Sequence, residues 1–221
     1  MAIDGTAFAA RVGKGSYDRR NELVTVGIFF GVVMIGVWLP PGRLVVGVTL
    51  GVLLGMVILS LRGIYSAREL GLSSPFSGAV HVLGAGAVLC GVIVVIGFFT
   101  RAIGPAQPAP WHRVWGYAIW ALMQQFMLQS FFFVRLESAL GERRAVWAAA
   151  LLFAIPHLPN PLLTLLSFLG AVFFCEMFRR YRNLFPLGVV HAALGLTIAA
   201  SLPDSVLHHM RVGLGYLTYH P

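Results

Sequence analysis

The feature that most constrains this chain is a series of seven apolar runs separated by short connectors. They cover residues 23–39, 44–61, 79–100, 114–134, 146–157, 161–178 and 184–202. A helix of about 17–25 residues crosses a bilayer, and only the fifth run is shorter than that. Charged residues make up 11% of the chain, whereas a soluble domain has about 25%. The sequence therefore predicts an all-α membrane bundle of about seven transmembrane helices, in which the fifth and sixth form a tight hairpin.

The basic residues predict how these helices are oriented. Short cytoplasmic loops carry the excess of Lys and Arg in membrane proteins. If the seven runs alternate across the membrane, twelve of the 16 basic residues fall on the side of the N-terminus. We therefore expect the N-terminus in the cytoplasm. The net charge of +8 does not indicate nucleic-acid binding, because the charges form no basic face and lie singly or in small groups between apolar runs.

One membrane domain accounts for the length of the chain. We expect a cytoplasmic segment at residues 1–22, a transmembrane domain at 23–202, and a short extracytoplasmic tail at 203–221 that caps the membrane interface. The two cysteines, Cys90 and Cys175, lie far apart inside apolar runs. They form neither a disulfide framework nor a Cys-x-x-Cys metal motif, and we expect both to be small core residues.

Polar side chains inside three of the runs are the strongest sign of function, because polar groups are costly at the middle of a bilayer. The fourth run carries Gln124, Gln125 and Gln129, the fifth ends with His157, and the seventh contains His191. Gln125 and His157 each lie eleven residues into their runs, which is about 16 Å at ~1.5 Å per residue. We therefore expect these side chains to line one internal polar chamber. The alternative is that they only form hydrogen bonds that join the helices.

Pro156 adds to this expectation. A proline inside a helix removes one backbone hydrogen bond, which here would free the carbonyl of Leu152 next to His157. Lipid cannot satisfy a free carbonyl, whereas a water molecule or a substrate group can. The proline thus predicts a polar or hydrated space at this depth.

Two further groups of residues leave alternatives open. Glu176 is either a proton source for the chamber or the ion-pair partner of Arg179 and Arg180, three and four residues further along the helix. We predict no cofactor. The alternative is a metal ion bound by imidazoles if the tail folds back onto the chamber, with the ligands His157, His191, His208 and His209.

Three short elements resemble the motifs of a known family in order and spacing. They are Gln124-Gln125-Phe-Met-Leu-Gln129, Phe153-Ala-Ile-Pro-His157, and His191 to Gly195, with further similarity at Glu69-Leu-Gly-Leu72 and Asn183 to His191. The corresponding motifs are Glu-Glu-x-x-x-Arg, Phe-x-x-x-His and His-x-x-x-Asn. They are typical of the CAAX protease and bacteriocin-processing family of intramembrane endopeptidases, which includes the Ras-converting CAAX endopeptidases. The resemblance covers residues 66–202 and implies a protein of the bacterial inner membrane.

The resemblance implies roles for these residues. Gln124, Gln125, His157 and His191 would belong to the catalytic set, and Glu176, which lies in none of the motifs, joins that set only as the possible proton source or substitute base. Gln129, Phe153 and Gly195 would contact the substrate. The first motif has glutamine at both glutamate positions and at the arginine, and Gly195 stands at the asparagine. Glutamine accepts no proton near neutral pH, so the glutamate mechanism of the family cannot run through Gln124.

Three functions remain open from the sequence. The first is an enzyme with a neutral, glutamine-lined site that acts on an isoprenoid or a lipidated peptide. The second is the endopeptidase activity of the family with a substitute base, either Glu176 or a histidine. The third is an inactive scaffold that binds a membrane protein. Membrane lipid and a lipid-like substrate are the expected partners, and no nucleic acid is expected.

Overall fold

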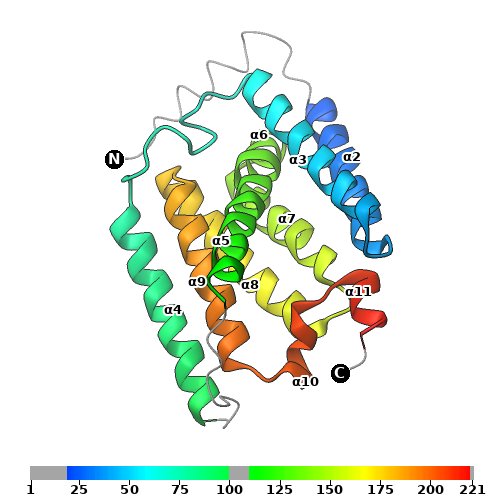
Figure 1. The fold of residues 1–221 in the computed structure, drawn as a ribbon. Helices are drawn as coiled ribbons and strands as arrows, with labels where there is room; N and C mark the ends of the chain where they lie inside the picture. Colours follow the sequence, from blue (N-terminus) through cyan, green and yellow to red (C-terminus); the bar gives the residue numbers. More distant parts are fainter. Residues whose placement is uncertain (1–18, 100–109, 220–221) are drawn as a thin grey trace.

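The computed structural model describes residues 19–99 and 110–219, and these residues form helices and no strands (Figure 1). The prediction of an all-α bundle is therefore confirmed for the described part of the chain. Most of the expected segment 1–22 lies outside the described residues. The elements are α2 (Arg19–Trp38), α3 (Arg43–Arg62), α4 (Ala79–Phe99), α5 (Trp111–Gln125), η1 (Phe126–Phe133), α6 (Val134–Leu140), α7 (Glu142–Ala154), η2 (Ile155–His157), α8 (Pro161–Tyr181), α9 (Phe185–Ser201), α10 (Asp204–Leu207), η3 (His208–Met210) and α11 (Gly213–Leu217).

Each of the seven apolar runs coincides with helical structure. Among the described residues, α2, α3, α4 and α8 are each long and apolar enough to cross a membrane. A fifth span results if α9 is taken together with residues 204–210, from which it is bent by 119°. The molecule is thus an integral membrane protein with four or five spans by this measure. The count of seven spans and the cytoplasmic N-terminus stay predictions.

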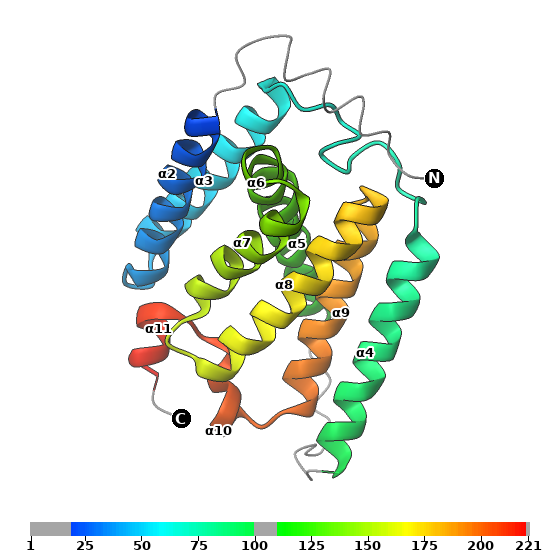
Figure 2. The same ribbon diagram turned by 180° about the vertical axis from the view of Figure 1, so that it is seen from behind.

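The bundle is built around the continuous rod of α5, η1 and α6. On one side α2 and α3 form a hairpin that packs against α6 and η1, and on the other side α9 packs against both α5 and α4 (Figures 1 and 2). The helices α7 and α8 form the tight pair that the proline-rich turn predicts. The outer helix α4 exposes large apolar side chains such as Val80 and Phe98, as lipid-facing residues do.

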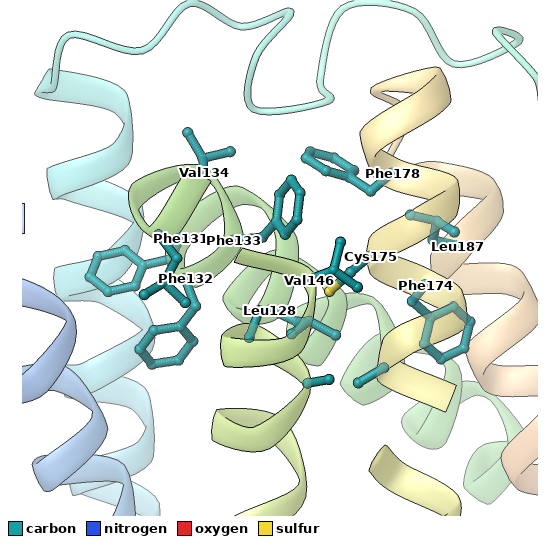
Figure 3. Packing of buried hydrophobic residues seen from close by; sticks show 14 of the residues in the cluster. Leu128, Phe131, Phe132, Phe133, Val134, Val146, Phe174, Cys175, Phe178 and Leu187 are labelled. Carbon is teal, nitrogen blue, oxygen red and sulfur yellow. The ribbon is translucent and has the colours of Figure 1, made fainter. Parts of the chain in front are cut away.

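A π-helix interrupts the rod where the polar and aromatic core residues are densest. In η1 the hydrogen bonds reach one residue further than in an α-helix, so that the N–H of Val134 donates to the carbonyl of Gln129. Phe131 and Phe133 on η1 are fully buried, and Phe133 packs edge-on against Phe178 of α8 (Figure 3). Short π segments inside helices occur frequently at functional sites. Here the segment begins directly after Gln125.

Ion pairs join the ends of several helices at one end of the bundle. Arg135 on α6 contacts Glu22 on α2 at 3.3 Å, and Arg182 after α8 pairs with Glu137 on α6. These contacts bring together three of the segments that the distribution of basic residues assigns to one side of the membrane. Because the contacts do not tell the two faces of the membrane apart, they leave the orientation as a prediction.

The tail folds back at the opposite end as the short helices α10, η3 and α11 (Figure 1). The side-chain amide of Asn160 donates to the carbonyl of Leu207 at 2.9 Å, and the N–H of Gly213 donates to the carbonyl of Leu158 at 2.8 Å. Both bonds attach the tail to the turn between α7 and α8. The position of the tail outside the membrane stays a prediction.

Candidate active site

A cavity of about 810 Å³ is bounded by the helices from α2 to α5, by η1, and by α7 to α9 with η2, and the tail contributes Met210, Val212 and Gly215 to its wall. Most of the wall consists of aliphatic and aromatic side chains. A cavity with apolar walls and a few convergent polar groups is typical of small-molecule and substrate sites. The polar side chains on its wall are Thr49, Tyr117, Trp120, Gln124, His157, Ser167 and His191.

Five of the eight site residues predicted from the sequence line this cavity. They come from three separate helical segments, which the fold therefore brings to one space as expected. Their chemical roles stay predictions. The five are Gln124, Phe153, His157, His191 and Gly195.

Gln125 and Gln129 lie behind the wall and are fully buried. The amide nitrogen of Gln129 donates to Oε1 of Gln125 at 3.3 Å, and the amide nitrogen of Gln125 lies 3.1 Å from Nδ1 of His191. Because its oxygen already accepts from Gln129, Gln125 turns its NH₂ group toward the imidazole. In this orientation Nδ1 of His191 accepts the hydrogen bond, and the proton of the neutral ring lies on Nε2.

On His157 the proton lies on the other ring nitrogen, Nδ1. Its Nδ1 lies 2.8 Å from the backbone carbonyl oxygen of Phe153. A carbonyl oxygen only accepts, so Nδ1 must carry the proton, and the neutral ring has its lone pair on Nε2. The carbonyl that the imidazole uses belongs to Phe153, one residue after the Leu152 carbonyl predicted from Pro156. The reason is that α7 ends at Ala154 and residues 155–157 continue as a 3₁₀ turn, which shifts the hydrogen bonds by one residue.

Aromatic rings hold both imidazoles in place. The ring of Phe153 lies between them, with centroid distances of 5.2 Å to His157 and 5.9 Å to His191. Phe174 on α8 stacks on His191 at 5.3 Å. With Nδ1 engaged on each ring, Nε2 is the nitrogen left for a molecule in the cavity. One imidazole therefore presents an acceptor to that molecule and the other presents a donor.

Tyr117 is a residue of the site that the sequence reasoning missed. It lines the cavity from α5, and its hydroxyl oxygen occupies the place into which a Cβ atom on Gly195 would point. The only signal in the sequence is that Tyr117 precedes Gln124 by seven residues and so shares its face of a helix.

Glu176 does not belong to the site. Its carboxylate pairs with Arg179 at 2.8 Å and with Arg180 at 2.7 Å, and it does not line the cavity. The spacing of three and four residues along α8 places both guanidinium groups beside the carboxylate. The structure thus supports the ion-pair alternative and gives no support to a catalytic Glu176.

The four imidazoles of the alternative metal site are not brought together. His208 and His209 lie in the tail against the rings of Tyr216 and Tyr219, and His209 also bonds Asp204. Within residues 19–99 and 110–219 no three His, Cys, Asp or Glu side chains converge as metal ligands would.

Residues 106–197 match the model of a family described as Type II CAAX prenyl endopeptidase Rce1-like. The part of this chain that builds the site is therefore similar to the CAAX protease family. The match begins just before α5 and ends within α9. It therefore includes all the cavity residues from Tyr117 on α5 to Gly195 on α9. No curated protein and no solved structure matches the chain.

Proposed function

We propose that this chain is a member of the CAAX protease family that hydrolyses a peptide carrying a lipid chain, and that His157 and His191 are its reacting groups. One observation carries the proposal. Two imidazoles line the same cavity, and the hydrogen bonds at their Nδ1 atoms leave an acceptor on His157 and a donor on His191. An acceptor and a donor on one substrate space are what general acid–base catalysis requires.

The shape and lining of the cavity support a lipidated substrate. Its volume of about 810 Å³ lies in the range of about 300–1,000 Å³ found for ligand sites. Its apolar wall comes from α2, α3 and α8, while the imidazoles and Gln124 stand on α5, η2 and α9. A substrate with an apolar chain and a polar peptide bond would place each part against the matching wall.

The reaction follows from the protons on the two rings. Nε2 of His157 accepts a proton from a water molecule while the water oxygen forms a bond to the peptide carbonyl carbon. The N–H of His191 donates a hydrogen bond to the carbonyl oxygen as negative charge develops there. The His157 imidazolium then gives its proton to the leaving amine as the C–N bond breaks, which returns the ring to its starting state.

The lining residues support His157 as the base. No Asp or Glu side chain is found on the described wall of the cavity, and the amide of Gln124 cannot take a proton near neutral pH. Imidazole is the side chain whose ordinary pKa lies closest to neutrality. Of the two imidazoles, only that of His157 has a lone pair on the nitrogen that is left for the substrate.

The glutamines at 124, 125 and 129 support the proposal that the site works without a charged side chain. Loss of one partner from a buried ion pair costs about 3–5 kcal/mol. If the two acids and the arginine of the family motif were all replaced by amides, no buried charge would be left alone. The chain of hydrogen bonds from Gln129 through Gln125 to His191 then orients an imidazole without any charge.

Cleavage of a farnesylated peptide tests the proposal. Purified protein in lipid nanodiscs would be incubated with a farnesylated peptide, and the products would be separated by mass spectrometry. We expect cleavage by the wild type and at least about 100-fold less by His157→Gln, which is the range of general acid–base catalysis. His81→Gln is the matched control, because His81 stacks on Tyr181 away from the cavity, and it should keep full activity.

Two other outcomes would separate the alternatives. Binding of the peptide without cleavage would contradict the hydrolase and favour the inactive scaffold. Cleavage that survives His157→Gln but is lost in Glu176→Gln would contradict the assignment of the base and favour the other substitute base.

A further inference from the structure

The hydroxyl group of Tyr117 occupies the space that any side chain on residue 195 would need. A Cβ atom built on Gly195 meets the hydroxyl oxygen and the ring of Tyr117. We infer that this hydroxyl is a second hydrogen-bond donor to the substrate carbonyl, beside the imidazole of His191. The inference rests on the proposed function and assigns to that site a residue that no sequence motif includes.

The position of the phenol gives the first support. Tyr117 lines the cavity, as do His191 and Gly195. Gly195 follows His191 by four residues, so the two lie on one face of α9 and are separated by about 6 Å along the axis. Because the hydroxyl lies over Gly195, it stands about one helical turn from the imidazole.

The hydrogen bonding of the phenol gives the second support. Its hydroxyl has no hydrogen-bond partner within the described part of the chain, whereas Tyr65 and Tyr219 use their hydroxyls for hydrogen bonds to Ser138 and Asp204. The hydroxyl lies on the wall of a mainly apolar cavity, where an unsatisfied polar group is costly. A polar group of the substrate in the cavity would be its partner.

The chemistry of the phenol fits an oxyanion better than a proton transfer. An ordinary phenol has a pKa of about 10 and stays protonated at neutral pH, so it donates one hydrogen bond and leaves the proton count of the reaction unchanged. Together with the N–H of His191 it would give the carbonyl oxygen two donors on the wall formed by α5 and α9. The water molecule activated by His157 would then approach from the side of η2.

The position of the Tyr117 hydroxyl requires glycine at residue 195. Any larger residue at position 195 would push the phenol out of its place, because the atoms it would meet belong to the hydroxyl and the ring. The absence of a side chain at position 195 and the presence of the hydroxyl are therefore one feature of the site. This explains why the departure from asparagine at residue 195 need not remove a donor from the cavity.

The first test removes only the hydroxyl. Tyr117→Phe and the matched control Tyr181→Phe would be compared with the wild type for cleavage and for binding of the same farnesylated peptide, with thermal unfolding as the check on folding. Tyr181 stacks on His81 outside the cavity. We expect Tyr117→Phe to lower kcat at least about 10-fold with little change in KM, because an oxyanion donor acts in the transition state. Tyr181→Phe should match the wild type.

The second test distinguishes hydrogen bonding from packing. Tyr117→Ala empties the space above residue 195, and Gly195→Asn or Gly195→Leu would refill it in that background. Asparagine and leucine have similar shapes, but only asparagine can donate. We expect the asparagine variant to regain at least about 5-fold in cleavage over Tyr117→Ala, and the leucine variant to regain stability alone.

The possible results separate this inference from the proposed function. Full activity in Tyr117→Phe, or equal rescue by asparagine and leucine, would overturn the role of Tyr117 while the hydrolase stands. If the wild type binds the peptide without cleaving it, the hydrolase fails and the oxyanion role of Tyr117 fails with it; a binding constant at least about 10-fold weaker in Tyr117→Phe would then support only a donor to the carbonyl of the bound peptide, and unchanged binding would overturn that too. A wild type that neither binds nor cleaves the peptide would overturn both.

Discussion

The side-chain amide nitrogen of Gln125 lies 3.1 Å from Nδ1 of His191. This contact joins α5 to α9 and fixes which nitrogen of the imidazole carries the proton. Gln125 is in turn held by Gln129, one turn further along the rod. The two buried amides therefore act as the orienting groups of a residue on the cavity wall, and they do so without a charge.

Replacing the orienting amide should separate activity from stability. In Gln125→Leu the NH₂ group of Gln129 loses its acceptor, which costs about 1–3 kcal/mol for a buried donor. In Gln125→Leu/Gln129→Leu both partners are apolar, so we expect much of the stability to return, measured by thermal unfolding in detergent. Cleavage should stay at least about 100-fold reduced in both, because His191 loses its orientation. Recovery of activity in the double variant would contradict the role of Gln125.

A carboxylate at residue 124 should add a second base to the site, one that is ionised at neutral pH. Gln124 lines the cavity, so Gln124→Glu places an acid where the substrate lies. We expect faster cleavage of the farnesylated peptide at neutral pH and loss of this gain as the pH falls and the carboxylate becomes protonated. The control is Gln129→Glu, because Gln129 is fully buried behind the wall and should gain no activity. An unchanged rate in Gln124→Glu across the pH range would show that residue 124 does not face the reacting atoms.

Asn160 should determine whether the tail stays attached to the bundle. Its oxygen caps the start of α8 by accepting from the N–H of Leu163 at 3.1 Å, while its NH₂ group donates to the carbonyl of Leu207. We expect Asn160→Asp to keep the cap but lose the tail contact, and Asn160→Ala to lose both at about 0.5–2 kcal/mol for the cap. Hydrogen exchange of residues 204–219 should rise in both variants. If it is unchanged in both, this contact does not hold the tail.

The ion pair at the other end should contribute far more than its exposed counterparts. The side chain of Arg135 is 4% exposed and that of Glu22 is 19% exposed. Removing one partner of a buried pair costs about 3–5 kcal/mol, and since Glu22 is partly open we expect Glu22→Ala to destabilise toward the lower end of that range. The matched control is Arg180→Ala, since the Arg180 side chain is 55% exposed and such pairs contribute about 0–1 kcal/mol. Equal shifts in unfolding temperature would contradict the difference in burial.

The sequence predicts the helices well because hydropathy and helix length are local properties. The short fifth run and its proline turn indicate the α7–α8 pair, and the structure has that pair. The π-helix η1 was not predicted, because its run of Phe-Met-Leu-Gln-Ser-Phe-Phe-Phe has ordinary helical composition. The location of the tail depends on single hydrogen bonds from Asn160 and Gly213 to distant carbonyls, which no local pattern encodes.

The site was predictable where a polar residue lies inside an apolar run. His157, His191 and Gln124 stand out for that reason, and all three line the cavity. Tyr117 did not stand out, since a tyrosine near Trp111 and Trp115 is common at a membrane interface. The spacing of Glu176 from Arg179 allows both an ion pair and a free carboxylate, and only the positions of the guanidinium groups decide between them.

Cleavage in ¹⁸O-labelled water measures the central claim most directly. If a water molecule activated by His157 attacks the peptide carbonyl, the newly formed carboxyl group of the farnesylated product should contain one ¹⁸O atom, and its rate of formation should fall at least about 100-fold in His157→Gln. A labelled product formed at the same rate by folded His157→Gln protein, or no product from the wild type, would contradict the account.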